Sequence, residues 1–116
     1  MARVVAFIPD LLFGSNVVGA LSAAGHEVQL VSDPGAAAAS PADVVVVDLT
    51  ADAADRIARV SALDLEGART LAFYSHVEAD VRTAAEAAGF DLVVPRSRMN
   101  RDGAALVERL ALDAAP

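Results

Sequence analysis

The stretch Ala42-Asp43-Val44-Val45-Val46-Val47-Asp48-Leu49-Thr50 decides the fold of this chain. Four consecutive β-branched residues bounded by polar ones are typical of a strand that is buried on both faces, as in a parallel sheet. Asp48 follows the valines directly, and open α/β sheets bind their ligands at the carboxyl ends of the strands. The same stretch therefore predicts both an architecture and a candidate site.

Further strand-like runs alternate with helix-like segments along the chain. The predicted strands cover residues 4–9, 27–31, 44–48, 70–74 and 92–94, and the predicted helices begin at Ser15 or Asn16, at Thr50 or Asp52, at Asp80 and at about Asp102. Residues 34–41, between two prolines, leave room for at most one or two helical turns. Strands that alternate with helices through short connections form a parallel sheet. We expect one α/β domain over residues 1–116, a three-layer, doubly wound sheet of five parallel strands in the order 2-1-3-4-5.

Composition excludes several classes of function. The formal net charge of −7 argues against a nucleic-acid binder, because neutralising phosphates requires a basic face. The chain has no cysteine and no lysine, which excludes disulfides, thiolate chemistry and Schiff bases. No apolar stretch approaches the roughly 20 residues that cross a bilayer. The N-terminus lacks the layout of a signal peptide, so we expect a cytoplasmic protein without a membrane partner.

Two carboxylates are candidates for the site. Asp10 follows the first predicted strand and Asp48 the third, so we expect them to flank the crevice between these strands, where they could hold Mg²⁺. Asp48 could instead be a capping or arginine-paired carboxylate, and Asp10 could simply close a turn. Ser75 and His76 are neighbours at a strand end, so their side chains point to opposite sides and form no nucleophile–base pair. We therefore predict no catalytic residue and no enzyme.

Two other segments could bind an anion. The turn Gly14-Ser15-Asn16 is expected at a helix N-terminus that faces the crevice, where backbone N–H groups can bind an anion. Arg96, Arg98 and Arg101 follow the last strand in an expected loop. These arginines either balance neighbouring acids in solvent or form a docking point for a phosphate or an acidic partner.

Four further residues are expected to have structural rather than functional roles. Leu11, Leu12 and Phe13 are expected in the core, or as an exposed apolar patch if they form a loop over the site. His26 is expected to be a solvated loop residue.

The layout resembles the receiver domain of bacterial two-component response regulators over nearly the whole chain. Residues 42–49 resemble the family's third strand, whose terminal aspartate accepts a phosphoryl group, which makes Asp48 the candidate phosphoacceptor. Ser75 stands where receivers carry a switch threonine or serine, and Arg96 falls on the position of the family's lysine. Residues 87–94 resemble the glycine and final strand that precede that lysine. The resemblance implies a flavodoxin-like fold and a role in two-component signalling.

The departures from the receiver pattern concern the chemistry of the site. Pro9 occupies one of the family's two adjacent acidic positions and Asp10 the other, so one Mg²⁺ ligand is missing. Arg96 cannot replace a compact ammonium, and its guanidinium could pair with Asp48 and occupy the place of the metal. The usual proline after the acceptor is absent. These departures argue against Mg²⁺-dependent phosphorylation of Asp48 and indicate a degenerate receiver.

The leading hypothesis is a stand-alone, degenerate receiver-like signalling module that acts by binding another protein. In receivers, the face formed by the fourth helix, the fifth strand and the fifth helix carries partner or homodimer contacts, and here that region is rich in alanine. The alternative is a small anion- or nucleotide-binding domain that uses the Gly14-Ser15-Asn16 turn and the Arg96–Arg101 loop. Gly25-His26-Glu27-Val28 also resembles the opening of nucleotide-sugar glycosyltransferases, in the N-terminal segment only.

Overall fold

Five parallel strands form one sheet in the order β2-β1-β3-β4-β5, as the sequence predicted. In this computed structural model, which describes residues 1–114, they are β1 (Arg3–Phe7), β2 (Glu27–Val31), β3 (Val44–Asp48), β4 (Arg69–Tyr74) and β5 (Leu92–Pro95). The central strand β3 pairs with β1 and β4, and all five of its residues are buried. β2 is an edge strand and only partly buried, which fits its mixture of polar and apolar residues.

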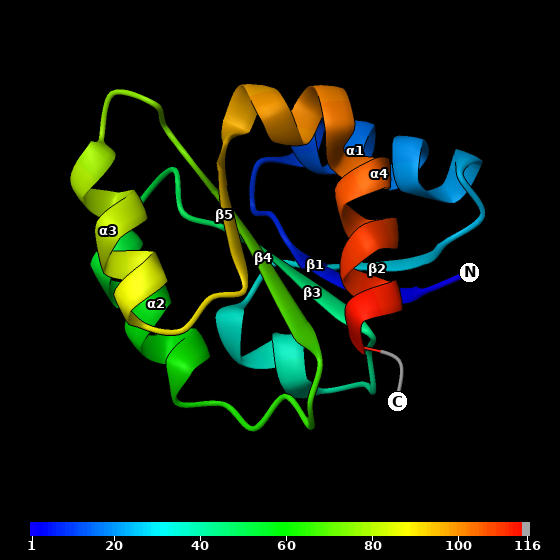
Figure 1. The fold of residues 1–116 in the computed structure, drawn as a ribbon, viewed down its shortest axis with the longest axis horizontal. Coiled ribbons are helices and arrows are strands. Elements are labelled where there is room, and N and C mark those ends of the chain that lie inside the picture. Colours follow the sequence, from blue (N-terminus) through cyan, green and yellow to red (C-terminus); the bar gives the residue numbers. More distant parts are fainter. Residues whose placement is uncertain (115–116) are drawn as a thin grey trace.

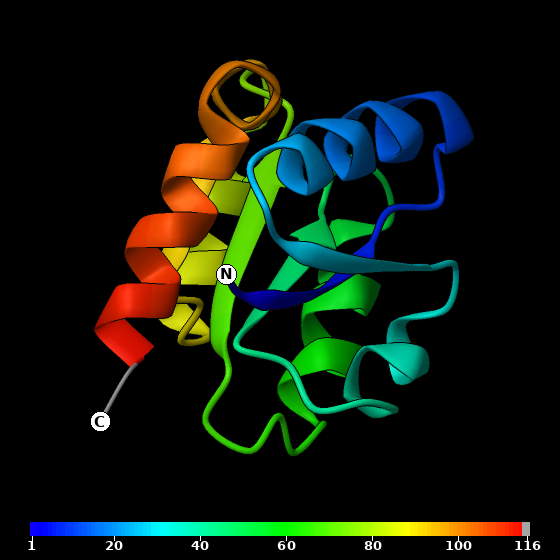
Figure 2. The same cartoon turned by 90° about the vertical axis from the view of Figure 1, so that its right-hand side faces the viewer.

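Helices cover both faces of the sheet (Figure 1). On one face lie α1 (Leu11–Ala23) and α4 (Arg96–Ala114), and on the other lie α2 (Ala53–Ser61), α3 (Ala79–Ala87) and the short 3-10 helix η1 (Pro34–Ala38). Figure 2 shows the sheet between these two layers from the side. Val44 and Val46 pack toward α1 and α4, whereas Val45 and Val47 pack toward α2 and α3, because successive side chains of a strand alternate between faces. The valine run therefore supplies the centre of both cores.

The helix α1 begins earlier than the sequence predicted. Asp10 caps it, because its Oδ1 accepts a hydrogen bond from the Phe13 N–H at 3.0 Å. Gly14, Ser15 and Asn16 therefore lie inside the helix, and the Gly14 N–H already donates to the Asp10 carbonyl at 2.8 Å. The prediction of an anion-binding turn at these three residues rested on the wrong helix start.

The helix α4 also begins early, at Arg96, directly after β5. Met99 is buried and continues the apolar stripe of Leu106, Val107 and Leu110 toward the N-terminus of the helix. A Cβ at Gly103 would lie 3.0 Å from Met99 Cε, so the glycine makes room for this side chain. The predicted Arg96–Arg101 loop is thus wrong, because these residues form the first turns of a helix anchored by Met99.

Several side chains lie elsewhere than predicted. His26 is buried rather than solvated. It directly precedes β2, and its Nδ1 accepts a hydrogen bond from the Ala2 N–H at 3.1 Å. Leu11 and Leu12 are 77% and 75% exposed, while Phe13 is buried and stacks on Phe73. The placement of Leu11, Leu12 and Phe13 follows from the early start of α1, because the first two residues of this helix face solvent. No helix within residues 1–114 is both long and apolar enough to span a bilayer.

Candidate functional site

Asp48 is buried at the carboxyl end of β3, with 3% of its surface exposed. Its Oδ1 accepts hydrogen bonds from the backbone N–H of Thr50, at 2.8 Å, and from the Thr50 hydroxyl. Its Oδ2 lies 3.7 Å from Nη1 of Arg56, and the same nitrogen donates a 3.0 Å hydrogen bond to the Asp48 carbonyl oxygen. Oδ1 and the carbonyl oxygen of Asp48 therefore accept hydrogen bonds within the chain, and Oδ2 makes an ion-pair contact that is longer than a hydrogen bond.

Arg56 reaches this edge of the sheet from α2. It shares a helix face with Ala53, Ile57 and Val60, at the spacing i, i+3, i+4 and i+7 of a buried stripe. Its guanidinium carbon lies 5.1 Å from the centre of the Phe7 ring, within the range of a cation–π contact. The Arg56 and Asp48 side chains are only 13% and 5% exposed. Burial, an aromatic ring and a carboxylate thus fix the guanidinium in one position.

Sequence analysis missed Arg56, and the signal that could have found it is the helical spacing. Ala54 is exposed, and Arg56 takes a position on the buried face of α2. An arginine in the middle of an apolar stripe indicates a buried acidic partner, because a charge is rarely buried without one.

The predicted pair between Arg96 and Asp48 is not formed. Instead, Nη2 of Arg96 lies 3.7 Å from Oδ2 of Asp10, and the guanidinium carbon lies 4.4 Å from the centre of the Phe13 ring. Because α4 begins at Arg96, this side chain crosses toward the N-terminus of α1 rather than toward β3. The two candidate carboxylates therefore contact different arginines, Asp48 with Arg56 and Asp10 with Arg96.

Asp10 and Asp48 do not fit a magnesium site. The oxygens of Asp48 are engaged by Thr50 and Arg56, and the positive charge of Arg56 opposes a cation beside them. Asp10 is half exposed and holds the first turn of α1 and Arg96. No group of three or more histidine, aspartate or glutamate side chains within the described part of the chain is placed to hold a metal ion.

An open cleft of about 660 Å³ lies at this carboxyl edge of the sheet. Its lining comprises Phe13, Asn16, Thr50, Ser75, His76, Arg96, Ser97 and Asn100. The predicted switch residue Ser75 and the predicted charge partner Arg96 meet here, and so does Asn16 from the predicted anion-binding turn. Asp10, Asp48, Gly14 and Ser15 do not line the cleft.

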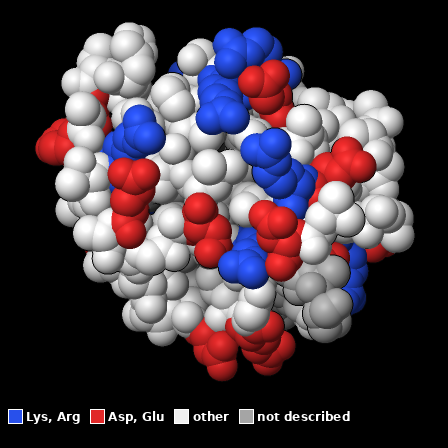
Figure 3. All heavy atoms as spheres, in the orientation of Figure 1, with Lys and Arg blue, Asp and Glu red and all other residues white. Residues whose placement is uncertain are grey.

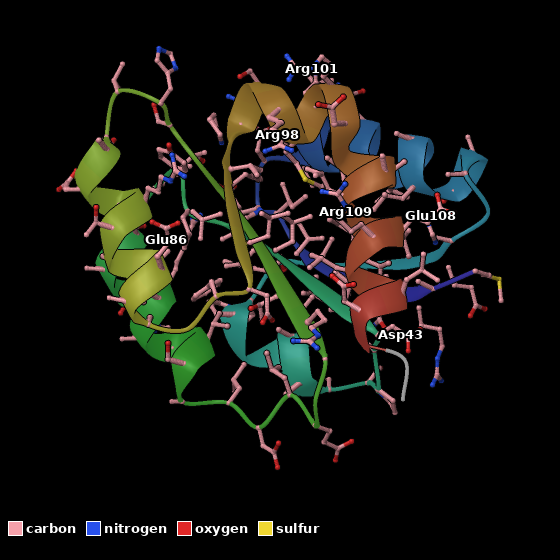
Figure 4. All side chains as sticks on the ribbon, in the orientation of Figure 1. Asp43, Glu86, Arg98, Arg101, Glu108 and Arg109 are labelled. Atoms are coloured by element: carbon pink, nitrogen blue, oxygen red, sulfur yellow. The ribbon has the colours of Figure 1, made fainter. Side chains whose placement is uncertain are left out.

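Arg98 and Arg101 lie on the exposed side of the first turns of α4 (Figure 4). Nε of Arg98 and Nε of Arg101 lie 4.0 Å and 3.2 Å from Oδ2 of Asp102. Figure 3 shows basic and acidic side chains interspersed on the face that α4 covers. This arrangement matches the interpretation in which these arginines balance neighbouring acids in solvent.

No family model matches the chain, and no curated protein sequence matches it. Solved receiver domains match nearly its whole length. The receiver domain of the Francisella response regulator 1452 superposes with a TM-score of 0.84 at 13% identity, over 99% of this chain and 100% of that one. The receiver domain of NarL from Mycobacterium tuberculosis is 26% identical, with a TM-score of 0.76 and 96% of each chain covered.

NtrX from Brucella abortus matches with a TM-score of 0.83 at 17% identity. The match covers 97% of this chain but 26% of NtrX, so the chain spans about a quarter of that protein. The strand order, the layers and these superpositions agree with one another. The chain has the flavodoxin-like fold of response-regulator receiver domains, as its sequence indicated.

Proposed function

We propose that the chain is a receiver-like signalling module that acts through contacts with another protein, in a state that does not depend on phosphorylation of Asp48. The receiver fold supports a signalling role. The observation that carries the rest is the buried Asp48–Arg56 pair, because it engages the carboxylate in the position of the phosphoacceptor.

Transfer of a phosphoryl group to a carboxylate needs an oxygen that can approach phosphorus in line and a cation that neutralises the developing charge. At Asp48 the neighbouring cation is the guanidinium of Arg56, which lies against the carboxylate itself, and neither carboxylate oxygen is open to an approaching phosphorus atom. Oδ1 of Asp48 accepts two hydrogen bonds from Thr50, and its Oδ2 faces Arg56 in a place that is almost closed to solvent. Arg56 is part of the chain and stays in place, whereas a metal ion would exchange. The edge of the sheet at Asp48 is therefore held in one state.

The surface proposed for partner contacts is formed by α3, β5 and α4. These are the fourth helix, fifth strand and fifth helix of the sequence prediction, which counted residues 34–41 as a helix. Ala84 and Ala87 on α3, Ala88 at its C-cap and Ala105 on α4 are exposed, while Ala85 packs into the core. These small side chains on the two helices leave space for a partner helix or for a second copy of the chain to approach the backbone.

The test is phosphorylation in vitro. The protein is incubated with Mg²⁺ and acetyl phosphate, or with beryllofluoride, and followed by intact mass and amide NMR shifts, with a phosphorylatable receiver domain in parallel. We expect no phosphoryl adduct and the same spectra for the wild type and Asp48→Asn. A Mg²⁺-dependent adduct on the wild type that Asp48→Asn lacks would show that Asp48 is a working acceptor.

The partner surface has a separate test. Sedimentation measures self-association of the wild type, of Ala88→Arg at the C-cap of α3 and of Ala54→Arg, an exposed alanine on α2 that serves as the matched control. Dimerisation through the proposed face would be lost in Ala88→Arg and kept in Ala54→Arg. If both variants lose dimerisation, or if neither does, the dimer contact does not lie on the proposed face.

A further inference from the structure

We propose that the cleft at the carboxyl edge of the sheet binds a diffusible phosphate monoester without forming a covalent bond to it, and that Arg96 is its principal charged contact. This inference goes beyond the proposed function, because it assigns a small-molecule ligand to the module. It does not use Asp48, which lies outside the lining of the cleft.

The chemistry of the lining favours an anion. Seven of the eight lining residues carry polar side chains that can donate a hydrogen bond, and none of them is acidic. The chain has 16 acidic residues and a formal net charge of −7, so a cleft of this size without a carboxylate stands out from the rest of the molecule. An anion would gain donors here without meeting a like charge in the lining.

The donors of the cleft are free to serve a ligand. Within residues 1–114 no hydrogen bond engages the side chains of Asn16, Ser75, His76, Ser97 or Asn100. They come from α1, from the end of β4 and from the first turns of α4. Figure 1 shows that the β4–α3 connection and the start of α4 lie at the same end of the sheet. These donors therefore converge from separate elements on one space.

Arg96 is placed at this cleft and is only partly engaged. The Phe13 ring lies 4.4 Å from its guanidinium carbon and fixes its position, while the 3.7 Å separation from Asp10 is longer than a hydrogen bond. Half of the Arg96 side chain is exposed. The planar guanidinium can donate two parallel hydrogen bonds to a phosphate, which a free lysine ammonium would not do.

The volume of the cleft favours a phosphate that carries an organic group. Sites for small molecules commonly enclose about 300–1,000 Å³, and this cleft has about 660 Å³. Orthophosphate alone would leave most of it to water. The two asparagine amides, Asn16 and Asn100, can contact a sugar or a base beyond the phosphate.

The experiment is an NMR titration of the ¹⁵N-labelled protein with AMP, ribose 5-phosphate and orthophosphate, with adenosine as the uncharged control. We expect saturable shifts at Ser75, at His76 and over residues 96–100 for AMP and ribose 5-phosphate, weaker shifts for orthophosphate and none for adenosine. The ratio of the AMP and ribose 5-phosphate affinities separates a contact to the base from a contact to the sugar phosphate alone.

Four variants make the titration specific. Arg96→Gln should weaken AMP binding by about tenfold or more, because a charge-assisted hydrogen bond is lost. Asp10→Asn keeps the cap of α1 and frees Arg96, so it should bind AMP at least as tightly. Arg109→Gln, an exposed arginine farther along α4, and Asp48→Asn should leave the affinity unchanged.

The spectrum of each variant also reports whether it is folded. The proposal is overturned if millimolar AMP, ribose 5-phosphate and orthophosphate all produce no saturable shift at these residues. It is equally overturned if a folded Arg96→Gln binds AMP as tightly as the wild type. The two proposals can fail separately. Phosphorylation of wild-type Asp48 would refute the proposed function, whereas the AMP affinity of Asp48→Asn tests non-covalent binding in the cleft alone.

Discussion

Replacing Arg56 by methionine leaves the buried carboxylate of Asp48 without its charged partner. Removing one member of a buried ion pair costs about 3–5 kcal/mol. The two hydrogen bonds from Thr50 remain and a methionine side chain retains part of the packing, so we place the loss at the lower end, about 3 kcal/mol. Against an unfolding free energy of about 6–17 kcal/mol for a chain of this length, the loss is large. With an unfolding entropy of about 2.1 cal/mol/K per residue, it corresponds to a fall in Tm of about 12 °C.

Arg59→Met on the same helix is the matched control. Nε of Arg59 lies 2.8 Å from Oδ2 of Asp55, a shorter contact than that between Arg56 and Asp48, but both side chains are more than 60% exposed. Such a surface pair contributes about 0.3–0.5 kcal/mol, and methionine forms helices as well as arginine does. We therefore expect Arg56→Met to lower the free energy of unfolding several times more than Arg59→Met does, although Arg56 makes the longer contact.

The assay is urea unfolding followed by circular dichroism on both single variants, on Asp48→Asn and on the double variant Arg56→Met/Asp48→Asn. Neutralising Asp48 removes the uncompensated charge, so the double variant should recover part of the stability lost in Arg56→Met. Equal losses for Arg56→Met and Arg59→Met would refute the reasoning, because burial would then not decide the strength of the pair. Strictly additive losses in the double variant would show that the two side chains do not interact.

Three further substitutions test the structure away from this pair. Gly19→Ala should stabilise the protein by about 0.5–1 kcal/mol in thermal unfolding, because Gly19 lies in the middle of α1 with nothing near the position of a Cβ. Asp10→Ala should cost about 1 kcal/mol, because the Phe13 N–H loses its cap, whereas Asp10→Asn should cost little; equal losses would argue against capping. His26→Ala should cost about 1–3 kcal/mol, since the buried Ala2 N–H loses its acceptor, and a neutral result by urea unfolding would contradict that hydrogen bond.

The sheet could be predicted from the sequence because each strand carries its own signal. The valine run identifies β3 as central, the alternating residues 27–31 identify β2 as an edge, and short connections leave little choice of strand order. The starts of α1 and α4 could not be predicted in the same way. At both places a helix follows a strand almost directly, and its first residues, Leu11-Leu12 and Arg96-Ser97-Arg98, lack the polar–apolar pattern of a helix start.

The sequence predicted where in the fold the candidate site lies, but not which of its side chains contact one another. Asp48, Ser75 and Arg96 do lie at the carboxyl edge of the sheet, since parallel strands bring their ends together. Which arginine pairs with which carboxylate depends on the tilt and start of α2 and α4, which residue spacing along the chain does not specify. Arg56 took the role that was predicted for Arg96, because the start of α4 directs Arg96 toward α1.

Because β3 is buried on both faces, the carboxylate of Asp48 is withdrawn from solvent whatever its function, and a buried carboxylate must be hydrogen-bonded and paired with a positive charge. A metal ion that meets this need can leave and return, so the site can change state. Arg56 meets it from a helix that begins five residues after Asp48, so the partner is present whenever the domain is folded. A signal that acts at this edge of the sheet must therefore act through groups that remain free. Arg96 and the hydroxyl and amide side chains of the adjoining cleft are such groups, which is why we propose the cleft, rather than Asp48, as the ligand site of this domain.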